Sequence, residues 1–179
     1  MAIRRLVTGQ REGKARVLSD GPVPTEHSFA AIPGMTSAII WTTAPAPAVD
    51  VEEAAPVGIP AHPEPGHTLM FVVDFPPDSV MADPSFDGAA AGAEQMHHLP
   101  GLAERFERDN PGMHTTDTVD YGIVLQGKIW LELDDGETTL LEAGDVVVQQ
   151  RTRHAWRNRG TEPARLAFVL VGTDRQAAG

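Results

Sequence analysis

Residues 111–137, PGMHTTDTVDYGIVLQGKIWLELDDGE, and residues 140–158, LLEAGDVVVQQRTRHAWRN, decide the fold of this chain. Short apolar runs alternate there with turn signals such as Gln126-Gly127 and Asp134-Asp135-Gly136. Short strands at this spacing are typical of a small antiparallel barrel or sandwich. The expected strands are residues 113–118, 119–126, 128–133, 138–142, 145–150, 154–158 and 164–171.

Proline divides the chain into two parts, because fourteen of its fifteen prolines lie at or before Pro111. Proline removes a ladder donor and is tolerated mainly at strand ends, edges and turns. The first part is therefore expected to hold a few strands joined by long irregular segments. We expect strands at 3–8, 15–18, 36–43 and 68–75, loops at 44–65 and 78–92, and a short helix within 93–108, mainly in 102–108.

The length of 179 residues predicts one structural domain overall. We divide it into an N-terminal extension with added strands and loops (1–110), a barrel core (111–172) and a tail (173–179). The chain has no cysteine, which excludes disulfides, cysteine-based zinc sites and thiol nucleophiles. Histidine, aspartate and glutamate remain as candidate metal ligands.

The formal net charge of -11 argues against two classes of partner. A strongly acidic chain without a clustered basic face is a poor ligand for nucleic acid and for an anionic membrane surface. No window approaches the roughly 20 apolar residues that span a bilayer, and the N-terminus does not read as a signal peptide. We expect a cytoplasmic protein that binds a small molecule, with no nucleic-acid or membrane partner.

Two polar faces within the barrel segment are the candidate site. Alternate side chains of a strand share a face. One such face carries His114, Thr116, Thr118 and Asp120, and a later one carries His154, Trp156 and Asn158. If the barrel closes, it gathers two imidazoles and one carboxylate. Such a 2-His-1-carboxylate set suits Fe(II) and other divalent ions, and Zn(II) also accepts these ligands.

These residues resemble the two motifs of the cupin superfamily, the small double-stranded β-helix barrels. In the first motif, His114 stands at the first histidine and Thr116 replaces the second, while Asp120 stands at the glutamate and six residues separate it from Gly127. The second motif runs from Gly144-Asp145 through His154 to Asn158. The resemblance covers about the last third of the chain. It implies an all-β cupin barrel of the single-domain, conserved-barrel type (cupin 2), with a Pro-rich N-terminal extension that adds strands.

The resemblance carries over three metal-binding and catalytic candidates: His114, Asp120 and His154. The implied cofactor is a divalent metal (Fe, Mn, Ni, Cu or Zn), and no organic cofactor is predicted. Each residue also has a purely structural interpretation. His114 would be a buried histidine bonded to a threonine, Asp120 a strand-end carboxylate or turn cap, and His154 a ring stacked on Trp156.

Further residues are candidates for substrate binding. Thr116 and Trp156 have the parity to line the pocket. Arg151 and Arg153 would hold a carboxylate or enolate if they lie at its rim, although exposed turn arginines are the commoner outcome. His98 would enter the pocket if the segment 93–108 covers the barrel mouth; otherwise His97-His98 lies in a surface loop.

Three functions follow from these residues. The first is a metal-dependent oxidoreductase of the dioxygenase kind. The second is a lyase, isomerase or decarboxylase with His114 or His154 as general base. The third is a non-catalytic ligand-binding cupin. Because cupins commonly pair through their sheets, the resemblance also predicts a homodimer.

Overall fold

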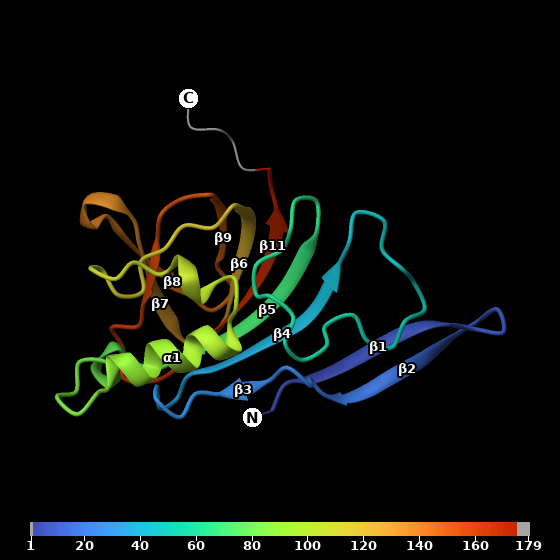
Figure 1. The fold of residues 1–179 in the computed structure, drawn as a ribbon, viewed down its shortest axis with the longest axis horizontal. Coiled ribbons are helices and arrows are strands. Elements are labelled where there is room, and N and C mark those ends of the chain that lie inside the picture. Colours follow the sequence, from blue (N-terminus) through green and yellow to red (C-terminus); the bar gives the residue numbers. More distant parts are fainter. Residues whose placement is uncertain (1, 175–179) are drawn as a thin grey trace.

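The computed structural model describes residues 2–174, which form an all-β fold with one α-helix (Figure 1). Residues 175–179 of the predicted tail lie outside the described part. The strands are β1 (Arg4–Arg11), β2 (Lys14–Pro22), β3 (His27–Ser28), β4 (Thr36–Thr43), β5 (Thr68–Phe75), β6 (Thr118–Gln126), β7 (Lys128–Glu132), β8 (Thr138–Glu142), β9 (Val146–Gln150), β10 (Ala155–Arg157) and β11 (Ala164–Gly172). The helix is α1 (Gly88–His98), and short 3-10 turns lie at Asp78–Val80, Ala103–Arg105 and Asp134–Gly136.

Two antiparallel sheets enclose the core. The larger has the strand order β3-β4-β5-β11-β6-β9 and the smaller the order β10-β7-β8. Strand β11 buries alternate residues, among them Leu166, Phe168 and Leu170, in the same apolar cluster as Ile129 and Leu141 of the smaller sheet. This alternation follows from the two-residue period of a strand. The core therefore lies between the two sheets.

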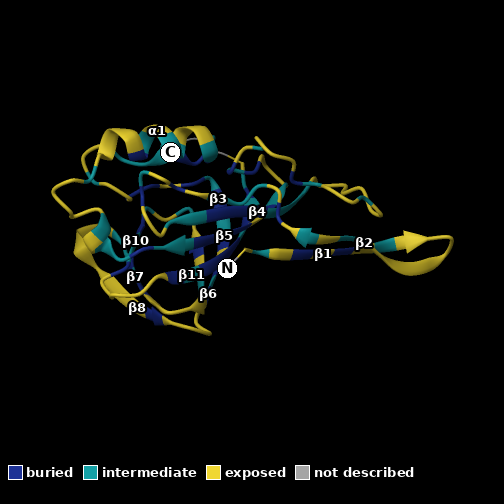
Figure 2. Cartoon of the chain, turned by 90° about the horizontal axis from the view of Figure 1, so that it is seen from below, coloured by how far each residue is buried: buried dark blue, intermediate teal, exposed yellow. Residues whose placement is uncertain are grey.

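The N-terminal extension does not form a separate layer. Its strands β3, β4 and β5 make up half of the larger sheet, because β5 pairs antiparallel with β11 along its whole length. Figures 1 and 2 show the hairpin β1–β2 projecting from this body. The predicted strands at 36–43 and 68–75 match β4 and β5 at both ends.

The predicted helix is displaced. It was expected within 93–108 and mainly in 102–108. Helix α1 spans Gly88–His98, so its second half lies in the predicted segment and its first half in a segment predicted as loop. Asp87 caps it by accepting hydrogen bonds from two backbone N–H groups of the first turn. Residues 102–108 form only a 3-10 turn, because the chain becomes extended at Phe106 to pair with His114.

The predicted strand at 113–118 is also not formed. Only His114 makes β-bridges there, and β6 begins at Thr118.

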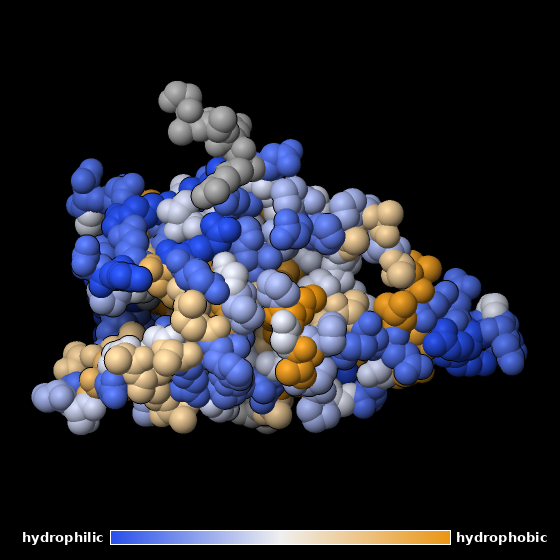
Figure 3. All heavy atoms as spheres, viewed as in Figure 1, coloured by the Kyte–Doolittle hydropathy of each residue, from blue (hydrophilic) through white to orange (hydrophobic). Residues whose placement is uncertain are grey.

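Helix α1 lies across one end of the barrel in Figure 1, and its surface is rich in small apolar residues in Figure 3. None of the helices within residues 2–174 is long and apolar enough to cross a bilayer.

Candidate functional site

A reciprocal backbone pair brings the two motif histidines together. The N–H of His114 donates to the carbonyl of His154 and the N–H of His154 to that of His114, both over 2.9 Å. The ring centroids lie 4.3 Å apart. Both side chains are buried, at 8% and 3% exposure, and both line one cavity. Imidazoles forty positions apart in the chain therefore meet at one wall.

Backbone carbonyls fix the orientation of both rings. His114 Nδ1 lies 3.0 Å from the Gly112 carbonyl oxygen, and His154 Nδ1 lies 2.9 Å from that of Thr152. A carbonyl only accepts, so each neutral ring carries its proton on Nδ1. Nε2 of each ring then presents a lone pair to a ligand.

Burial keeps both imidazoles neutral. It lowers the pKa of His154 to about 4, helped by the charge of His114, and it also lowers the pKa of His114. Desolvation disfavours the charged form of a histidine. Near neutral pH the two rings are therefore acceptors, bases or metal ligands rather than cations.

Asp120 is a buried carboxyl group in the same cavity, 5% exposed. Thr118 donates to the Thr116 hydroxyl over 2.7 Å, and Thr116 makes a long 3.5 Å hydrogen bond to Asp120 Oδ2. Oδ1 has no protein partner. Burial raises the pKa of Asp120 to about 6, and the threonine hydroxyls only partly oppose it.

Gln149 completes a polar cluster with Thr116, Thr118 and Asp120, and it was not predicted from the sequence. It is the cross-strand partner of Asp120 in the β6–β9 pair and is 3% exposed. It lines the cavity, and neither its amide nitrogen nor its amide oxygen has a hydrogen-bond partner within residues 2–174. Buried polar groups are normally hydrogen-bonded, so three orphaned atoms on two adjacent side chains indicate a place for a ligand. Gln149 lies two residues after Val147 on β9, so strand periodicity places both side chains on the inner face. This pattern could have identified Gln149 from the sequence.

The cavity itself measures about 400 Å³, within the usual range for small-molecule sites. Apart from the polar cluster, its walls are mainly apolar. They include Phe71, Phe75, Leu99, Leu102, Phe106, Trp156, Phe168 and Leu170. Trp156, predicted to line the pocket, lies edge-on to the His154 ring with centroids 5.9 Å apart.

Two predicted substrate-binding arginines do not line the cavity. Arg151 adopts a positive φ of 58° in the turn before His154 and pairs with Asp117 over 3.0 Å. Arg153 pairs with Glu107 and Asp134. Because both guanidiniums are engaged in ion pairs outside the cavity, their role as substrate contacts stays a prediction that the geometry does not favour.

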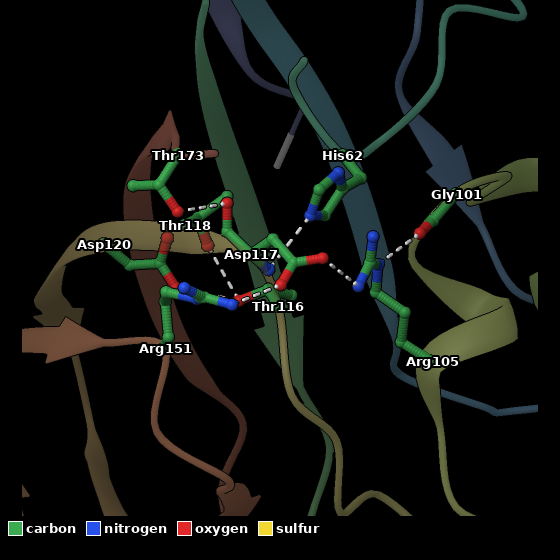
Figure 4. Close-up of polar contacts among 9 residues, drawn as sticks. All are labelled: His62, Gly101, Arg105, Thr116, Asp117, Thr118, Asp120, Arg151 and Thr173. Atoms are coloured by element: carbon green, nitrogen blue, oxygen red, sulfur yellow. Dashed lines mark hydrogen bonds and ion pairs between the residues drawn. The ribbon is translucent and has the colours of Figure 1, made fainter. Parts of the chain in front are cut away.

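Asp117 is the centre of the network that holds this part of the barrel to the extension (Figure 4). Its carboxylate pairs with Arg151 and, over 3.3 Å, with Arg105, while its backbone N–H donates to His62 Nε2. Asp117 faces away from Thr116, as neighbours on an extended chain do. It therefore positions the polar cluster without lining the cavity.

His98 also lies outside the cavity walls. It stacks on His27 with ring centroids 3.4 Å apart, and His27 Nε2 bonds to Glu94 Oε1 over 2.9 Å. Within residues 2–174, these three residues are the only group of at least three histidine or acidic ligands whose donor atoms all lie within 4.8 Å of one another.

The motif trio fits a metal only in part. The free Nε2 lone pairs of His114 and His154 are suitable ligands, and so is the orphaned Asp120 oxygen. However, His114, Asp120 and His154 are not among the groups whose ligand atoms converge. The 2-His-1-carboxylate site expected from the motif is therefore not a preformed three-ligand centre, and Thr116 occupies the position of the missing histidine.

Residues 107–171 match the family model described as "Cupin domain". This region is a cupin domain. The predicted motifs and the observed all-β architecture agree with that assignment. Outside the cupin domain, the match does not extend into the N-terminal strands.

Relatives of the cupin domain occur in fungi. The chain is 53% identical over 60 residues to "Phomopsin biosynthesis cluster protein C'" of Diaporthe leptostromiformis, covering 33% of this chain and 32% of that protein. It is 39% identical over 83 residues to "Cupin-domain-containing oxidoreductase srdD" of Neurospora crassa, covering 42% of each. The matches thus span only about a third to two-fifths of these relatives. Among solved structures, the Schizosaccharomyces pombe Cnp3 cupin domain aligns with 96% of this chain and 88% of that chain, with a TM-score of 0.45 and 13% identity.

The buried Asp120 carboxyl predicts a pH-dependent cost to stability. Its pKa rises from 3.8 to about 6 on folding, so ionisation opposes folding as pH rises through that interval. Between pH 4 and pH 8, the free energy of unfolding of Asp120→Asn should rise relative to that of wild type by on the order of 2 kcal/mol. Urea unfolding at both pH values measures this. The exposed control Asp109→Asn should show no such change; an Asp120→Asn effect that is equal at both pH values contradicts the shifted pKa.

Proposed function

We propose that this cupin is an enzyme that removes a proton from the carbon next to a carbonyl group of an uncharged, mainly apolar small molecule, as an isomerase or lyase does. The unpartnered Asp120–Gln149 pair carries this proposal. Among the described residues, the Oδ1 atom of Asp120 has no donor and the amide of Gln149 has no acceptor, and both side chains line one cavity. Base and oxyanion donor are the two groups that enolisation requires.

Asp120 is the proposed base. Its pKa of about 6 is closer to neutral pH than that of an ordinary aspartate, which strengthens the ionised form as a proton acceptor. Its Oδ1 atom has no competing protein donor. Since the residue is 5% exposed, water does not shield it as it would a surface carboxylate.

Gln149 is the proposed electrophile. The amide N–H₂ group would donate to the carbonyl oxygen and to the enolate that forms when Asp120 takes the proton. The two imidazoles would accept hydrogen bonds at Nε2 from a substrate hydroxyl. Their role here is orientation, because the low pKa of His154 makes it a weak base.

The cavity also favours a class of substrate. Its polar atoms are mostly acceptors, and an ionised Asp120 repels anions. Arg151 and Arg153 do not line the cavity. Arg157 does, but its guanidinium already pairs with Glu132 and donates to the Pro111 carbonyl, so that charge is largely offset. Aromatic and aliphatic walls favour an apolar body. We therefore favour neutral aldehydes, ketones and hydroxylated aromatic or alkyl carbonyl compounds over carboxylates and phosphates.

A metal-dependent oxidoreductase is the second candidate. Four of the similar fungal proteins bear the name cupin-domain-containing oxidoreductase, two from Neurospora crassa and one each from Hypocrea virens and Aspergillus ruber. The orientation of both imidazoles, with Nε2 free, is also compatible with a bound divalent ion. A cytoplasmic location stays a prediction for either candidate.

Deuterium exchange tests the first candidate. Wild-type protein is incubated in D₂O with a panel of neutral medium-chain aldehydes and aromatic ketones, with and without chelator, and α-deuterium is measured by NMR. Chelator-resistant exchange supports proton transfer. Exchange or oxidation that depends on added Fe, Mn, Ni, Cu or Zn supports the second candidate, and no turnover in either condition supports a non-catalytic ligand-binding cupin.

Replacing the proposed base should abolish most of this exchange. We expect Asp120→Asn to slow exchange by about 10²–10⁴-fold, with Asp109→Asn as the exposed control at wild-type rate. In wild type, the rate should fall about tenfold per pH unit below pH 6, as Asp120 becomes protonated. A flat profile between pH 5 and pH 7, measured with the most reactive compound, contradicts a role for Asp120 as base.

We also propose a homodimer through the outer face of β6 and β9. Four apolar side chains on these two strands are exposed: Tyr121, Leu125, Val146 and Val148. Tyr121 and Val148 are direct cross-strand partners, so the apolar surface is continuous. An apolar face of this kind is typical of an interaction surface.

Light scattering tests the dimer. At micromolar concentration the wild type should have twice the chain mass of 19.2 kDa, and Val148→Lys should shift it to the monomer. Val17→Lys, at an equally exposed valine of the β1–β2 hairpin, is the matched control and should remain dimeric. A monomeric wild type refutes the proposal.

A further inference from the structure

We propose that His27, Glu94 and His98 form a metal site for Zn²⁺-like cations, which fastens helix α1 to strand β3 outside the cupin cavity. We call these three residues the α1–β3 cluster. The proposal does not rest on the proposed enzymatic function, because it shares no residue with the Asp120–Gln149 pair.

The fold places the three donors on two elements. Glu94 and His98 are four residues apart on α1, so they lie on the same face of the helix. His27 comes from β3, the edge strand of the larger sheet. All three ligand atoms lie within 4.8 Å of one another. Residues that are almost seventy positions apart in sequence therefore converge without the help of the cupin motifs.

The donor set suits zinc. Two imidazole nitrogens and one carboxylate oxygen are ordinary Zn²⁺ ligands, with bonds of about 2.0–2.2 Å. Tetrahedral coordination at that bond length separates ligand atoms by about 3.4 Å. The donors therefore need to close by no more than about 1.4 Å. One of the two stacked imidazoles would also have to rotate out of the stack, because the nitrogen lone pairs lie in the ring planes. A fourth position remains for water or a further ligand.

Backbone groups hold Glu94 in place. Its Oε1 accepts from the N–H of Ala30 over 2.9 Å, and its Oε2 accepts from that of Ala31 over 2.8 Å. Hydrogen bonds of this kind orient the ligands of metal sites. The side chains of His27 and Glu94 are 27% and 17% exposed, so a cation from solvent can reach them.

The rings of His27 and His98 are in direct contact in a stack. The His27 and His98 rings are nearly parallel, at 9°, with centroids 3.4 Å apart. Two imidazolium ions at this distance would repel each other. A metal ion would take the place of the proton that now joins His27 Nε2 to Glu94 Oε1.

Binding at this cluster would fix one wall of the cupin cavity. Gln95 and Leu99 line the cavity and lie next to Glu94 and His98 along the chain. A cation between α1 and β3 would thus hold that wall against the barrel. Its role would be to position the helix, not to contact substrate.

Calorimetry with zinc alone tests the site. Chelator-treated full-length protein is titrated with ZnCl₂, and we expect one equivalent to bind and to raise the melting temperature. Glu94→Gln and His98→Gln should each weaken binding by at least about tenfold. His97→Ala is the matched control, because His97 neighbours His98 on α1 but is not a member of the cluster; its affinity should equal that of wild type.

A second pair of variants separates this site from the cupin cavity. His114→Ala with His154→Ala should leave the affinity for one Zn²⁺ unchanged. Loss of binding in that double variant, or unchanged binding in well-folded Glu94→Gln and His98→Gln, overturns the proposal. So does the absence of binding in wild type. Circular dichroism of each variant checks that the fold is retained.

Discussion

The reciprocal backbone hydrogen bonds between His114 and His154 are the constraint on which the candidate site depends. They join the segment that precedes β6 to the segment that precedes β10, so both motif histidines reach the same wall of the cavity. The adjacent carbonyls of Gly112 and Thr152 then set the ring orientations. The backbone pairing thus sets the position of both imidazoles, the two carbonyls set their tautomers, and burial keeps them neutral.

The polar cluster next to these rings is costly for the fold. An unsatisfied buried polar group costs about 1–3 kcal/mol, and Asp120 Oδ1 and both amide atoms of Gln149 lack partners. Nothing in the packing of the apolar core requires these two residues. Sites where a sequence departs from the rules of stable packing are often functional. Asp120 and Gln149 therefore combine a cost to stability with a position in the cavity.

Strand periodicity predicted what depends on local sequence. Thr36–Thr43 and Thr68–Phe75 were found with their observed bounds, and the alternation from His114 to Asp120 correctly indicated a polar inner face. Strand periodicity does not predict how distant segments pair. Neither the alignment of β5 with β11 nor the convergence of His27 with Glu94 leaves a pattern in the sequence. The observed helix begins earlier than predicted because Asp87 caps it, a start signal that the prediction did not use. Gln149 was not predicted as a site residue, although strand periodicity places it on the inner face.

The replacement of a motif histidine by Thr116 connects the metal question to the proton-transfer proposal. A threonine hydroxyl rarely binds a divalent ion, so this position contributes no strong ligand. Instead its hydroxyl is directed to Asp120 Oδ2, which leaves Oδ1 without a partner. Burial is the largest influence on the pKa of Asp120 and raises it to about 6, while hydrogen bonds from Thr118 and Thr116 partly oppose this. The same substitution that weakens a three-ligand centre thus produces a carboxylate suited to act as a base.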